Sequence, residues 1–574
     1  MSIASNSIPG VSSNSRQTRR VASKTTATWA VRFLVGTLRG TRAAPSSTYS
    51  LRNYRRNYST LPAKQSFAED TIYALSTAQG RAGIAIIRIS GPACLDIYRS
   101  LCPSKAPLKP RYATLRTLID SHAQDGPNVL DSDAIVLYFP APKTVTGEDV
   151  LELHVHGGPA TIKAVLAAIP KCAEGVRYAE PGEFTRRAFL NDRLDLAQVE
   201  SLADTLSADT EQQRRAAVRG TSGALGRTYE SWRAQLLLAR GEIEALIDFS
   251  EDQHFDEPPA ELLRNVTALV DGMLRGIRHH EAASARGELL RGGIRIALVG
   301  PPNVGKSSLM NLVVGREASI VSVEAGTTRD IVEVSLDIRG YLCSFADTAG
   351  FRGGSSSSSG SGAAEPIGIV EEEGIRRAKQ KALESDLVVV LAAVEPTVEG
   401  GFGIAYDEET LEIAAQAPES LLVVNKRDAV DETTFFALLE KFRAVVRARA
   451  PALEKTEVMA ISCKEAQAGS SVDSGGVHAL TDELAGSFAG MTSMPADMQD
   501  LLGVTERQRQ LLEQCRNWLE EYRRVTQPSD QAEEEPDIVL AAEYLRYAAD
   551  CLAKITGRGE SGDVEEVLGV IFEK

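Results

Sequence analysis

Gly300-Pro-Pro-Asn-Val-Gly-Lys-Ser307 is the stretch of this 574-residue sequence that decides its fold. It fits the pattern G-x-x-x-x-G-K-S/T and directly follows the apolar run 294–299, which predicts a buried strand. A strand, a glycine-rich turn and a helix beginning at Lys306 are the setting in which backbone N–H groups cradle phosphates. We expect Lys306 to reach the β- and γ-phosphates and the Ser307 hydroxyl to bind Mg²⁺. The residues expected to form this loop are Gly300, Asn303, Val304, Gly305, Lys306, Ser307 and Ser308.

Three further motifs follow in the order of a guanine-nucleotide site, each after a strand-like run. In Asp347–Gly350, the carboxylate can hold Mg²⁺ through water and the glycine lets the backbone approach the γ-phosphate. In Asn425–Asp428, the carboxylate can accept hydrogen bonds from two N–H groups of guanine, a pair of donors that adenine lacks. In Ser462–Lys464, a backbone N–H meets the guanine O6. Each motif alone is an ordinary turn, but together with the first they predict a GTP site. They are Asp347-Thr348-Ala349-Gly350, Asn425-Lys426-Arg427-Asp428 and Ser462-Cys463-Lys464.

The loop 325–330 lies where a GTPase keeps the threonine that closes over Mg²⁺, and we expect Thr328 to be that residue. A signalling GTPase has a glutamine directly after Asp-Thr-Ala-Gly to orient the attacking water, but this sequence has Phe351. Catalysis therefore has to come from elsewhere. Two candidates are Asn303, which could help to hold a monovalent cation in place of an arginine finger, and an acidic residue after Asp347.

The first 66 residues differ in composition from the rest of the chain. Eleven lysines and arginines, with many serines and threonines, precede the first acidic residue, Glu69. This composition is typical of a mitochondrial transit peptide, with a disordered basic tail as the alternative. Without those eleven charges the formal net charge of −15 becomes −26, which argues against a broad electrostatic binder of nucleic acid. The seven cysteines lack C-x-x-C spacing and predict reduced thiols, and no apolar run approaches the length of a membrane span.

The pattern of apolar residues predicts a multidomain protein of the α/β and α classes. Short apolar runs within 67–190 alternate with Gly/Pro turns and predict an α+β N-terminal domain. Helical spacing follows over 191–290, the GTPase motifs occupy 291–480, and helical spacing returns over 481–574. We expect the GTPase domain to be inserted into one helical domain, because neither helical half alone looks large enough to bury a core; two independent segments are the alternative. The residues with helical spacing are Tyr229, Trp232, Leu236, Ile243, Leu246, Leu511, Cys515, Trp518, Tyr522, Ile538, Ala542, Leu545, Ala549 and Leu552.

Four longer strings carry a family resemblance: Asp70–Arg81, Arg88–Pro92, Thr146–Pro159 and Pro181–Asp192. Through them the chain resembles the MnmE (TrmE) family of tRNA-modifying GTPases in its mitochondrial form, over nearly everything from Asp70 onward. The resemblance implies a folate-binding, dimer-forming N-terminal domain and a helical domain interrupted by the GTPase domain. It also implies a homodimer, a matrix location and a flavin-dependent partner of the MnmG (GidA) family. Together the two proteins would modify C5 of the wobble uridine in mitochondrial tRNAs, with a carboxymethylaminomethyl-type or taurinomethyl group.

The same resemblance implies roles for individual residues. Asn303 matches the family's K⁺-ligating asparagine, and the loop from Ser322 through Glu324 to Thr327 would close over the ion. Glu371 matches the glutamate that positions water. Arg88, Glu152 and Arg193 match the positions that bind 5-formyl-tetrahydrofolate or a related folate. His154 and His156 alternate on the same strand, and we expect ordinary strand histidines there in preference to a metal pair, because no third ligand stands nearby in sequence.

The sequence departs from the family pattern in two places. Family members usually end in Phe-Cys-Ile/Val-Gly-Lys, whereas this sequence ends in Val570-Ile-Phe-Glu-Lys574, and a Ser/Gly-rich insert occupies 353–362, between Asp347 and Glu371. One alternative is therefore a chain that binds GTP but is inactive in modification. A ribosome-assembly or regulatory GTPase of the Era/Der type, without modification activity, is the other alternative, although no basic RNA-binding stretch is present.

Overall fold

The computed structural model describes residues 70–103, 105–123, 126–248, 259–323, 334–346, 380, 382–397, 400–468, 473, 475–527 and 536–558. The expected targeting segment and the C-terminal end of the chain lie outside these ranges, as do the insert at 353–362 and several expected site residues. Those site residues are Glu324, Thr327, Thr328, Asp347, Thr348, Ala349, Gly350 and Glu371.

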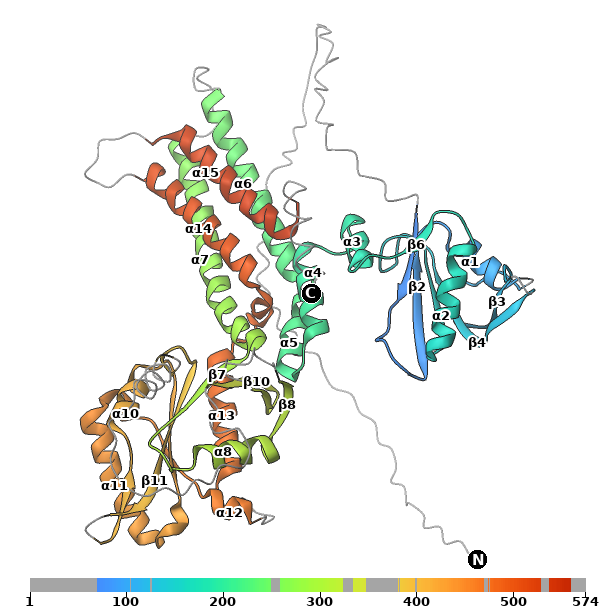
Figure 1. Ribbon diagram of the computed structural model, residues 1–574. Coiled ribbons are helices and arrows are strands. Elements are labelled where there is room, and N and C mark those ends of the chain that lie inside the picture. The colour runs from blue at the N-terminus through green and yellow to red at the C-terminus, as the bar shows by residue number, and fades with distance from the viewer. Residues whose placement is uncertain are drawn as a thin grey trace, which may run out of the picture. The chain divides into compact units, whose positions relative to one another are not determined.

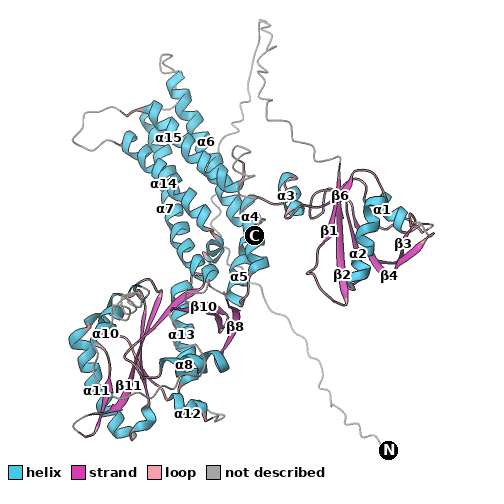
Figure 2. Ribbon diagram, viewed as in Figure 1, coloured by secondary structure: helices cyan, strands magenta, loops and turns pink. Residues whose placement is uncertain are grey.

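The N-terminal part is a six-stranded sheet with the strand order β3-β4-β5-β2-β1-β6 (Figures 1 and 2). The pairing is antiparallel except between β1 and β6. Short apolar runs of this part lie in β2, β4 and β5, so the predicted α+β character is confirmed. The elements are β1 (Thr71–Leu75), β2 (Ile84–Ser90), α1 (Cys94–Leu101), β3 (Thr114–Asp120), β4 (Asn128–Phe139), β5 (Val150–His156), α2 (Pro159–Ala168), β6 (Val176–Tyr178) and α3 (Glu183–Leu190).

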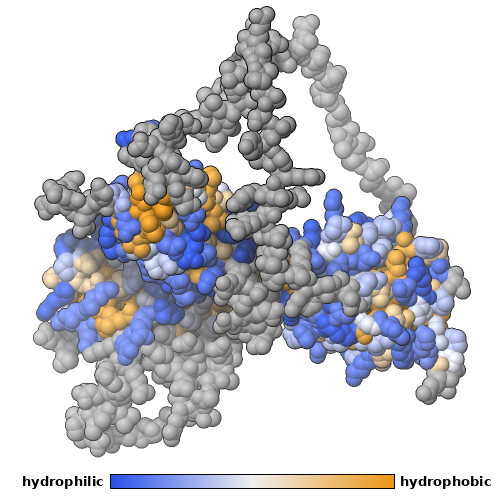
Figure 3. Space-filling view, turned by 90° about the horizontal axis from the view of Figure 1, so that it is seen from above, coloured by the Kyte–Doolittle hydropathy of each residue, from blue (hydrophilic) through white to orange (hydrophobic). Residues whose placement is uncertain are grey.

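Strand alternation gives this sheet two different faces. Ile87 and Leu153 point to one face, where they form a core with Ile97 of α1 and Val165 of α2. Successive strand residues point to opposite faces, so Arg88 on β2 lies on the other face. Figure 3 shows the surface of this part as mostly hydrophilic, with smaller apolar areas between the polar ones. Arg88 and its register partner Glu152, two of the residues expected to bind folate, are thus held on the face away from the core.

The helical part is one bundle built from two stretches of chain. Tyr229, Leu236 and Ile243, all fully buried, share a core with Tyr522 and Leu545 from the C-terminal stretch. This shared core confirms the predicted insertion and excludes two independent helical segments. The elements are α4 (Leu196–Ser207), α5 (Glu211–Gly220), α6 (Ala224–Asp248), α7 (Pro259–Gly292), the 3₁₀ helix η5 (Gln499–Gly503), α14 (Glu506–Thr526) and α15 (Ile538–Thr556).

One residue of the predicted helical core lies elsewhere. Trp518 is 36% exposed, and its ring stacks on Tyr544 at a centroid distance of 5.9 Å. The indole is wide, so it covers the α14–α15 seam from outside while the smaller Cys515 fills the interior.

The GTPase part is a mostly parallel sheet with the order β14-β13-β11-β7-β10-β9-β8, and β12 pairs with β11. Helices α8 and α13 cover one face, and α10 and α11 cover the other (Figure 1). The strand predicted at 294–299 is present as β7, and the strand-like runs before the three further motifs form β10, β13 and β14. Together with the helices on both faces, this is the doubly wound arrangement of an α/β domain. The elements are β7 (Ile294–Val299), α8 (Lys306–Leu312), β8 (Ala318–Val323), β9 (Val334–Ile338), β10 (Tyr341–Ala346), β11 (Leu387–Pro396), β12 (Phe402–Ala405), α10 (Glu408–Gln416), β13 (Ser420–Asn425), α11 (Glu432–Arg449), β14 (Val458–Ala460), α12 (Cys463–Gln467) and α13 (Val477–Thr492).

Helix α13 continues past residue 480, where the sequence pattern predicts the end of the GTPase region. Its Leu484 and Phe488 are buried in the same core as Ile296 of β7. All seven cysteines are free, and six of them are buried. Within the described ranges, no helix combines the length and the apolar character needed to cross a membrane.

Candidate functional site

The expected phosphate-binding loop lies at the carboxyl end of β7, which pairs with β11 on one side and with β10 on the other. Gly300 has φ 145°, and a Cβ there would be 2.1 Å from the carbonyl oxygen of Leu391 on β11. Gly305 has φ 102°, and its Cβ would be 2.3 Å from Nδ2 of Asn425. Only glycine fits at these two positions, because the loop passes directly against its neighbours. Lys306 begins α8, as the sequence predicts.

Lys306 places its charge inside this loop. Its Nζ donates hydrogen bonds to the carbonyl oxygens of Gly300 (2.7 Å) and Pro301 (2.9 Å). Burial lowers the pKa of Lys306 from its ordinary value, because a desolvated ammonium is less stable. An anion bound in the loop would form an ion pair with this half-buried ammonium and offset the cost of its burial.

Asn425 links three of the four predicted motifs. Its Nδ2 donates to the carbonyl oxygen of Val304 in the loop (2.8 Å), and its Oδ1 accepts from the backbone N–H of Cys463 (3.1 Å). The Ser462 hydroxyl donates to Oδ1 of Asp428 (2.6 Å). The structure thus brings the phosphate loop, the Asn425–Asp428 motif and the Ser462–Lys464 motif together at one edge of the sheet.

Two cations flank the Asp428 end of the site. Nζ of Lys464 lies 3.7 Å from Oδ2 of Asp428, and Nζ of Lys426 lies 3.0 Å from Oε1 of Glu395. Lys426 itself has φ 61°, a left-handed conformation at the tight turn after β13. The Glu395 partner was not predicted from the sequence, since it comes from the end of β11, about thirty residues upstream.

The residues expected to hold metal ions are only partly described. Ser307 lies in the first turn of α8, and Asn303 lies in the loop with φ 65°. Ser322 belongs to β8. A serine hydroxyl and an asparagine amide oxygen are suitable ligands for hard cations such as Mg²⁺ and K⁺. Among the described residues, no group of three or more His, Cys, Asp or Glu side chains forms a metal cluster.

Arg88 and Glu152, two of the three expected folate residues, are in direct contact. They are register partners on β2 and β5, and Arg88 donates from Nε (3.0 Å) and from its terminal nitrogen (2.9 Å) to Oε1 of Glu152. The third, Arg193, donates from Nε to the carbonyl oxygen of Thr144 (2.9 Å). Phe184 of α3, a residue not predicted from the sequence, has its ring centroid 6.0 Å from the Arg88 guanidinium.

A buried ion network fixes α3 to the sheet. Arg187 is 1% exposed and contacts Asp70 (2.8 Å), Glu183 (3.1 Å) and Glu148 (3.1 Å). Burial alone would raise the pKa of Glu183, but hydrogen bonds from Arg177 and Arg187 hold it below its ordinary value. Glu183 therefore stays ionised, and its ion pair with Arg187 helps to position the helix that carries Phe184.

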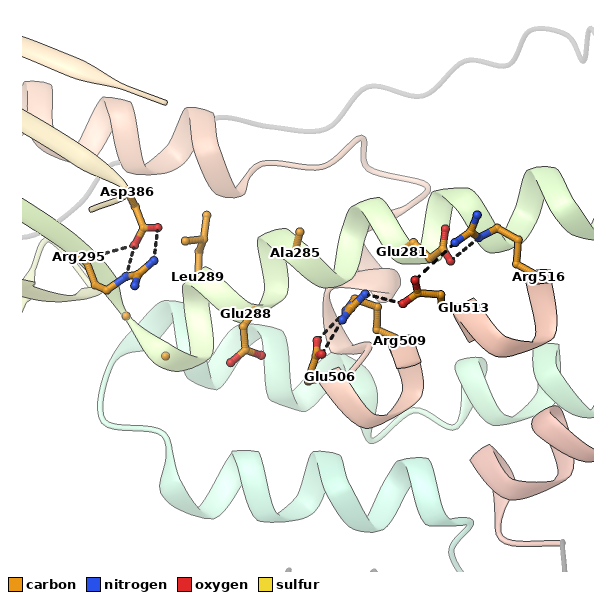
Figure 4. A pocket seen from close by; sticks show the side chains of 12 residues that line it. Glu281, Ala285, Glu288, Leu289, Arg295, Asp386, Glu506, Arg509, Glu513 and Arg516 are labelled. Carbon is orange, nitrogen blue, oxygen red and sulfur yellow. Dashed lines mark hydrogen bonds and ion pairs between the residues drawn. The ribbon is translucent and has the colours of Figure 1, made fainter. Parts of the chain in front are cut away.

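A separate cavity of about 700 Å³ lies where α7, β7 and α14 meet (Figure 4). Its arginines face acidic partners: Arg295 contacts Asp386 (3.1 Å), and Arg509 contacts Glu506 (2.6 Å). Arg516 likewise contacts Glu281 (2.9 Å). None of the predicted site residues lines this cavity, and its charges are largely matched within the protein.

Comparisons with known proteins agree with this geometry. The family described as GTP-binding protein TrmE N-terminus matches residues 71–193, and the family described as MnmE helical domain matches residues 196–574. The tRNA modification GTPase MnmE of Parvibaculum lavamentivorans is 40% identical over 515 residues, 88% of this chain and 98% of that protein. The mitochondrial 5-taurinomethyluridine-tRNA synthase subunit GTPB3 of Homo sapiens is 36% identical, covering 93% and 98% of the two chains. That of Danio rerio is 37% identical, covering 88% and 92%.

Proposed function

Because this chain belongs to the MnmE family of tRNA modification GTPases, we propose that it hydrolyses GTP to drive the modification of C5 of the wobble uridine in mitochondrial tRNAs. The observation that supports the proposal is the presence, on one chain, of two groups of polar residues that fit two different ligands. The predicted nucleotide motifs come together in a domain inserted into the helical bundle, and a separate N-terminal sheet carries the Arg88–Glu152 pair. A GTPase without modification activity has no evident need for the second site.

The chain's own residues account for nucleotide recognition. Backbone N–H groups of the loop and the Lys306 ammonium bind the phosphates, and the Asp428 carboxylate accepts the two guanine donors. Asn425 holds these groups at fixed spacing through its bonds to Val304 and Cys463. Mg²⁺, when bound, would neutralise the developing phosphate charge, and Ser307, Thr328 and Asp347 are proposed to hold it.

Hydrolysis is proposed to depend on K⁺ and on Glu371. Asn303, Ser322, Glu324 and Thr327 would surround the cation, which supplies the charge of an arginine finger. GTP turnover should fall sharply when Na⁺ replaces K⁺, and Asn303→Ala should remove that difference while leaving GTP bound. Equal rates in the two salts would exclude the cation role, and normal hydrolysis by Glu371→Ala would exclude that glutamate.

The N-terminal domain is proposed to bind 5-formyl-tetrahydrofolate or a related folate through Arg88, Glu152 and Arg193, and to form a homodimer. A guanidinium pairs with carboxylates, and a carboxylate accepts hydrogen bonds from pterin N–H groups, so the residues present fit this ligand. A flavoprotein of the MnmG type is the proposed partner, and folate would supply a one-carbon unit. The basic composition of 1–66 supports a mitochondrial, matrix location.

The deciding experiment is analysis of wobble uridines in mitochondrial tRNA after deletion of the gene and rescue with this chain. We expect the C5 modification to disappear on deletion, to return with the wild-type chain, and to stay absent with Asp428→Asn. Unchanged modification together with altered ribosome assembly would instead support a GTPase of the Era/Der type. Restored GTP binding without restored modification would support a chain inactive in modification.

A further inference from the structure

The carboxylate of Glu152 is held from two sides. Arg88 donates twice to Oε1, and Nε2 of His154 lies 3.3 Å from Oε2. Glu152 and His154 are two residues apart on β5 and therefore point to the same face of the sheet. Their side chains are 15% and 23% exposed, so both are largely withdrawn from water.

The neighbouring strands fix the position of the imidazole. His154 pairs in register with Ile86 of β2 on one side and with Ile135 of β4 on the other. Both isoleucines point to the same face, so they flank the ring with apolar side chains. The imidazole is confined between them, and the Glu152 carboxylate lies within its reach.

The hydrogen-bond capacity of Glu152 explains why this contact is important. Each carboxylate oxygen has about two acceptor positions. Arg88 occupies those of Oε1, and His154 occupies one position of Oε2, which leaves one acceptor position for a ligand. The last torsion of a glutamate is broad and poorly fixed on its own. A second contact on Oε2 therefore determines the plane in which the carboxylate meets an incoming N–H donor.

We propose that His154 is a positioning residue for folate recognition, acting through Glu152. The inference rests on the proposed folate site and deepens it, since it assigns to a strand histidine the orientation of the pterin-recognising carboxylate. His156, on the same face, shows what an ordinary strand histidine does here. Its ring is 66% exposed and bonds through Nδ1 to the buried Asp131 (2.9 Å), with no contact to Glu152 among the described interactions.

The test measures binding of 5-formyl-tetrahydrofolate to the full chain by isothermal titration calorimetry. We expect His154→Ala to weaken binding about tenfold, the loss typical of one hydrogen bond to a charged group. His154→Gln places an amide N–H near the position of Nε2 and should restore affinity to within about threefold of wild type. His156→Ala is the matched control and should leave affinity unchanged.

A double-mutant cycle separates positioning from a general structural effect. Glu152→Ala removes the carboxylate through which His154 acts, so adding His154→Ala to it should cause no further loss of affinity. Additive losses, or full affinity in His154→Ala, would overturn the inference while leaving the folate site intact. An absence of binding by the wild-type chain would overturn the folate assignment and this inference with it. If His154→Ala does not fold, His154→Asn, which is polar but too short to reach Oε2, replaces it and carries the same expectation.

Discussion

Asn425 shows how one side chain can hold a site together. It is 2% exposed and satisfies both the Val304 carbonyl and the Cys463 N–H. Replacement by alanine would leave two buried polar groups without partners, at a cost of about 1–3 kcal/mol each. We expect Asn425→Ala to weaken binding of a fluorescent GTP analogue at least tenfold and to reduce the thermal stabilisation given by GDP. Asn425→Asp keeps only the acceptor, so its affinity for the analogue should lie between those of the wild type and Asn425→Ala. An unchanged dissociation constant in Asn425→Ala would contradict the bridging role.

His280 makes the stability of the helical part depend on pH. It is 5% exposed, bonds to the Tyr229 hydroxyl (2.9 Å) and lies 5.1 Å from the ring of Trp232. Burial, with a smaller contribution from His279, lowers the pKa of His280 to about 4. The unfolded chain binds a proton near pH 6.5 and the folded chain does not, so stability falls as pH drops from about 6.5 to about 4. The loss is about 3 kcal/mol.

This pH effect can be read from Trp232 after Trp29 and Trp518 are replaced by phenylalanine. We expect the urea midpoint of that protein to fall between pH 6.5 and 4.5 more steeply than that of the same protein with His280→Gln, which cannot ionise. The comparison removes the contribution of all other titrating groups. Parallel curves for the two proteins would show that His280 binds its proton equally well in the folded and the unfolded chain, and would contradict this account.

At the scale of the element, α3 depends on the buried Arg187. Replacement by alanine leaves the Glu183 and Glu148 carboxylates without their shared cation, which typically costs about 3–5 kcal/mol. We expect Arg187→Ala to detach α3 from the sheet, which would appear as faster hydrogen exchange over 183–190. Folate binding should also weaken, because Phe184 on α3 would no longer lie against Arg88. Arg99→Ala is the control in the same domain. The Arg99–Asp96 pair is 70% and 61% exposed, so we expect a change below about 0.5 kcal/mol. Protection of α3 in Arg187→Ala would contradict this account.

Elements with a clear period could be predicted from the sequence, and contacts between elements could not. Short apolar runs between Gly/Pro turns predicted β2 and β5. The spacing of Tyr229, Leu236 and Ile243 predicted α6, because the helical period encodes the buried face. His154 and Glu152 lie two residues apart on one face of β5, so their contact could be expected from the sequence. The role of that contact depends on Arg88, which lies beside Glu152 only because of the pairing register of β2 and β5. Burial of Arg187 depends on Asp70 and Glu148, which come from two distant segments. These contacts carry no local sequence signal.

For the whole molecule, the shared core of α6, α7, α14 and α15 predicts which parts of the chain can fold alone. We propose that the inserted domain extends to Thr492, because Leu484 and Phe488 complete its core. The bundle core in turn contains residues from both sides of the insertion, such as Tyr229 and Tyr522. A bundle missing one stretch would expose large apolar surfaces on the other.

Excision of 294–492, with a short Gly/Ser linker in its place, tests this boundary. We expect the excised protein to unfold cooperatively, followed by Trp232 fluorescence, because all four bundle helices remain. A chain that stops at residue 292 keeps α6 and α7 but lacks α14 and α15, so Leu236 and Ile243 lose their cover. We expect that chain to bind a hydrophobic dye and to unfold without cooperativity. Cooperative unfolding of the shorter chain would show that the first helical stretch folds alone, and failure of the excised protein to fold would show that the bundle requires the inserted domain.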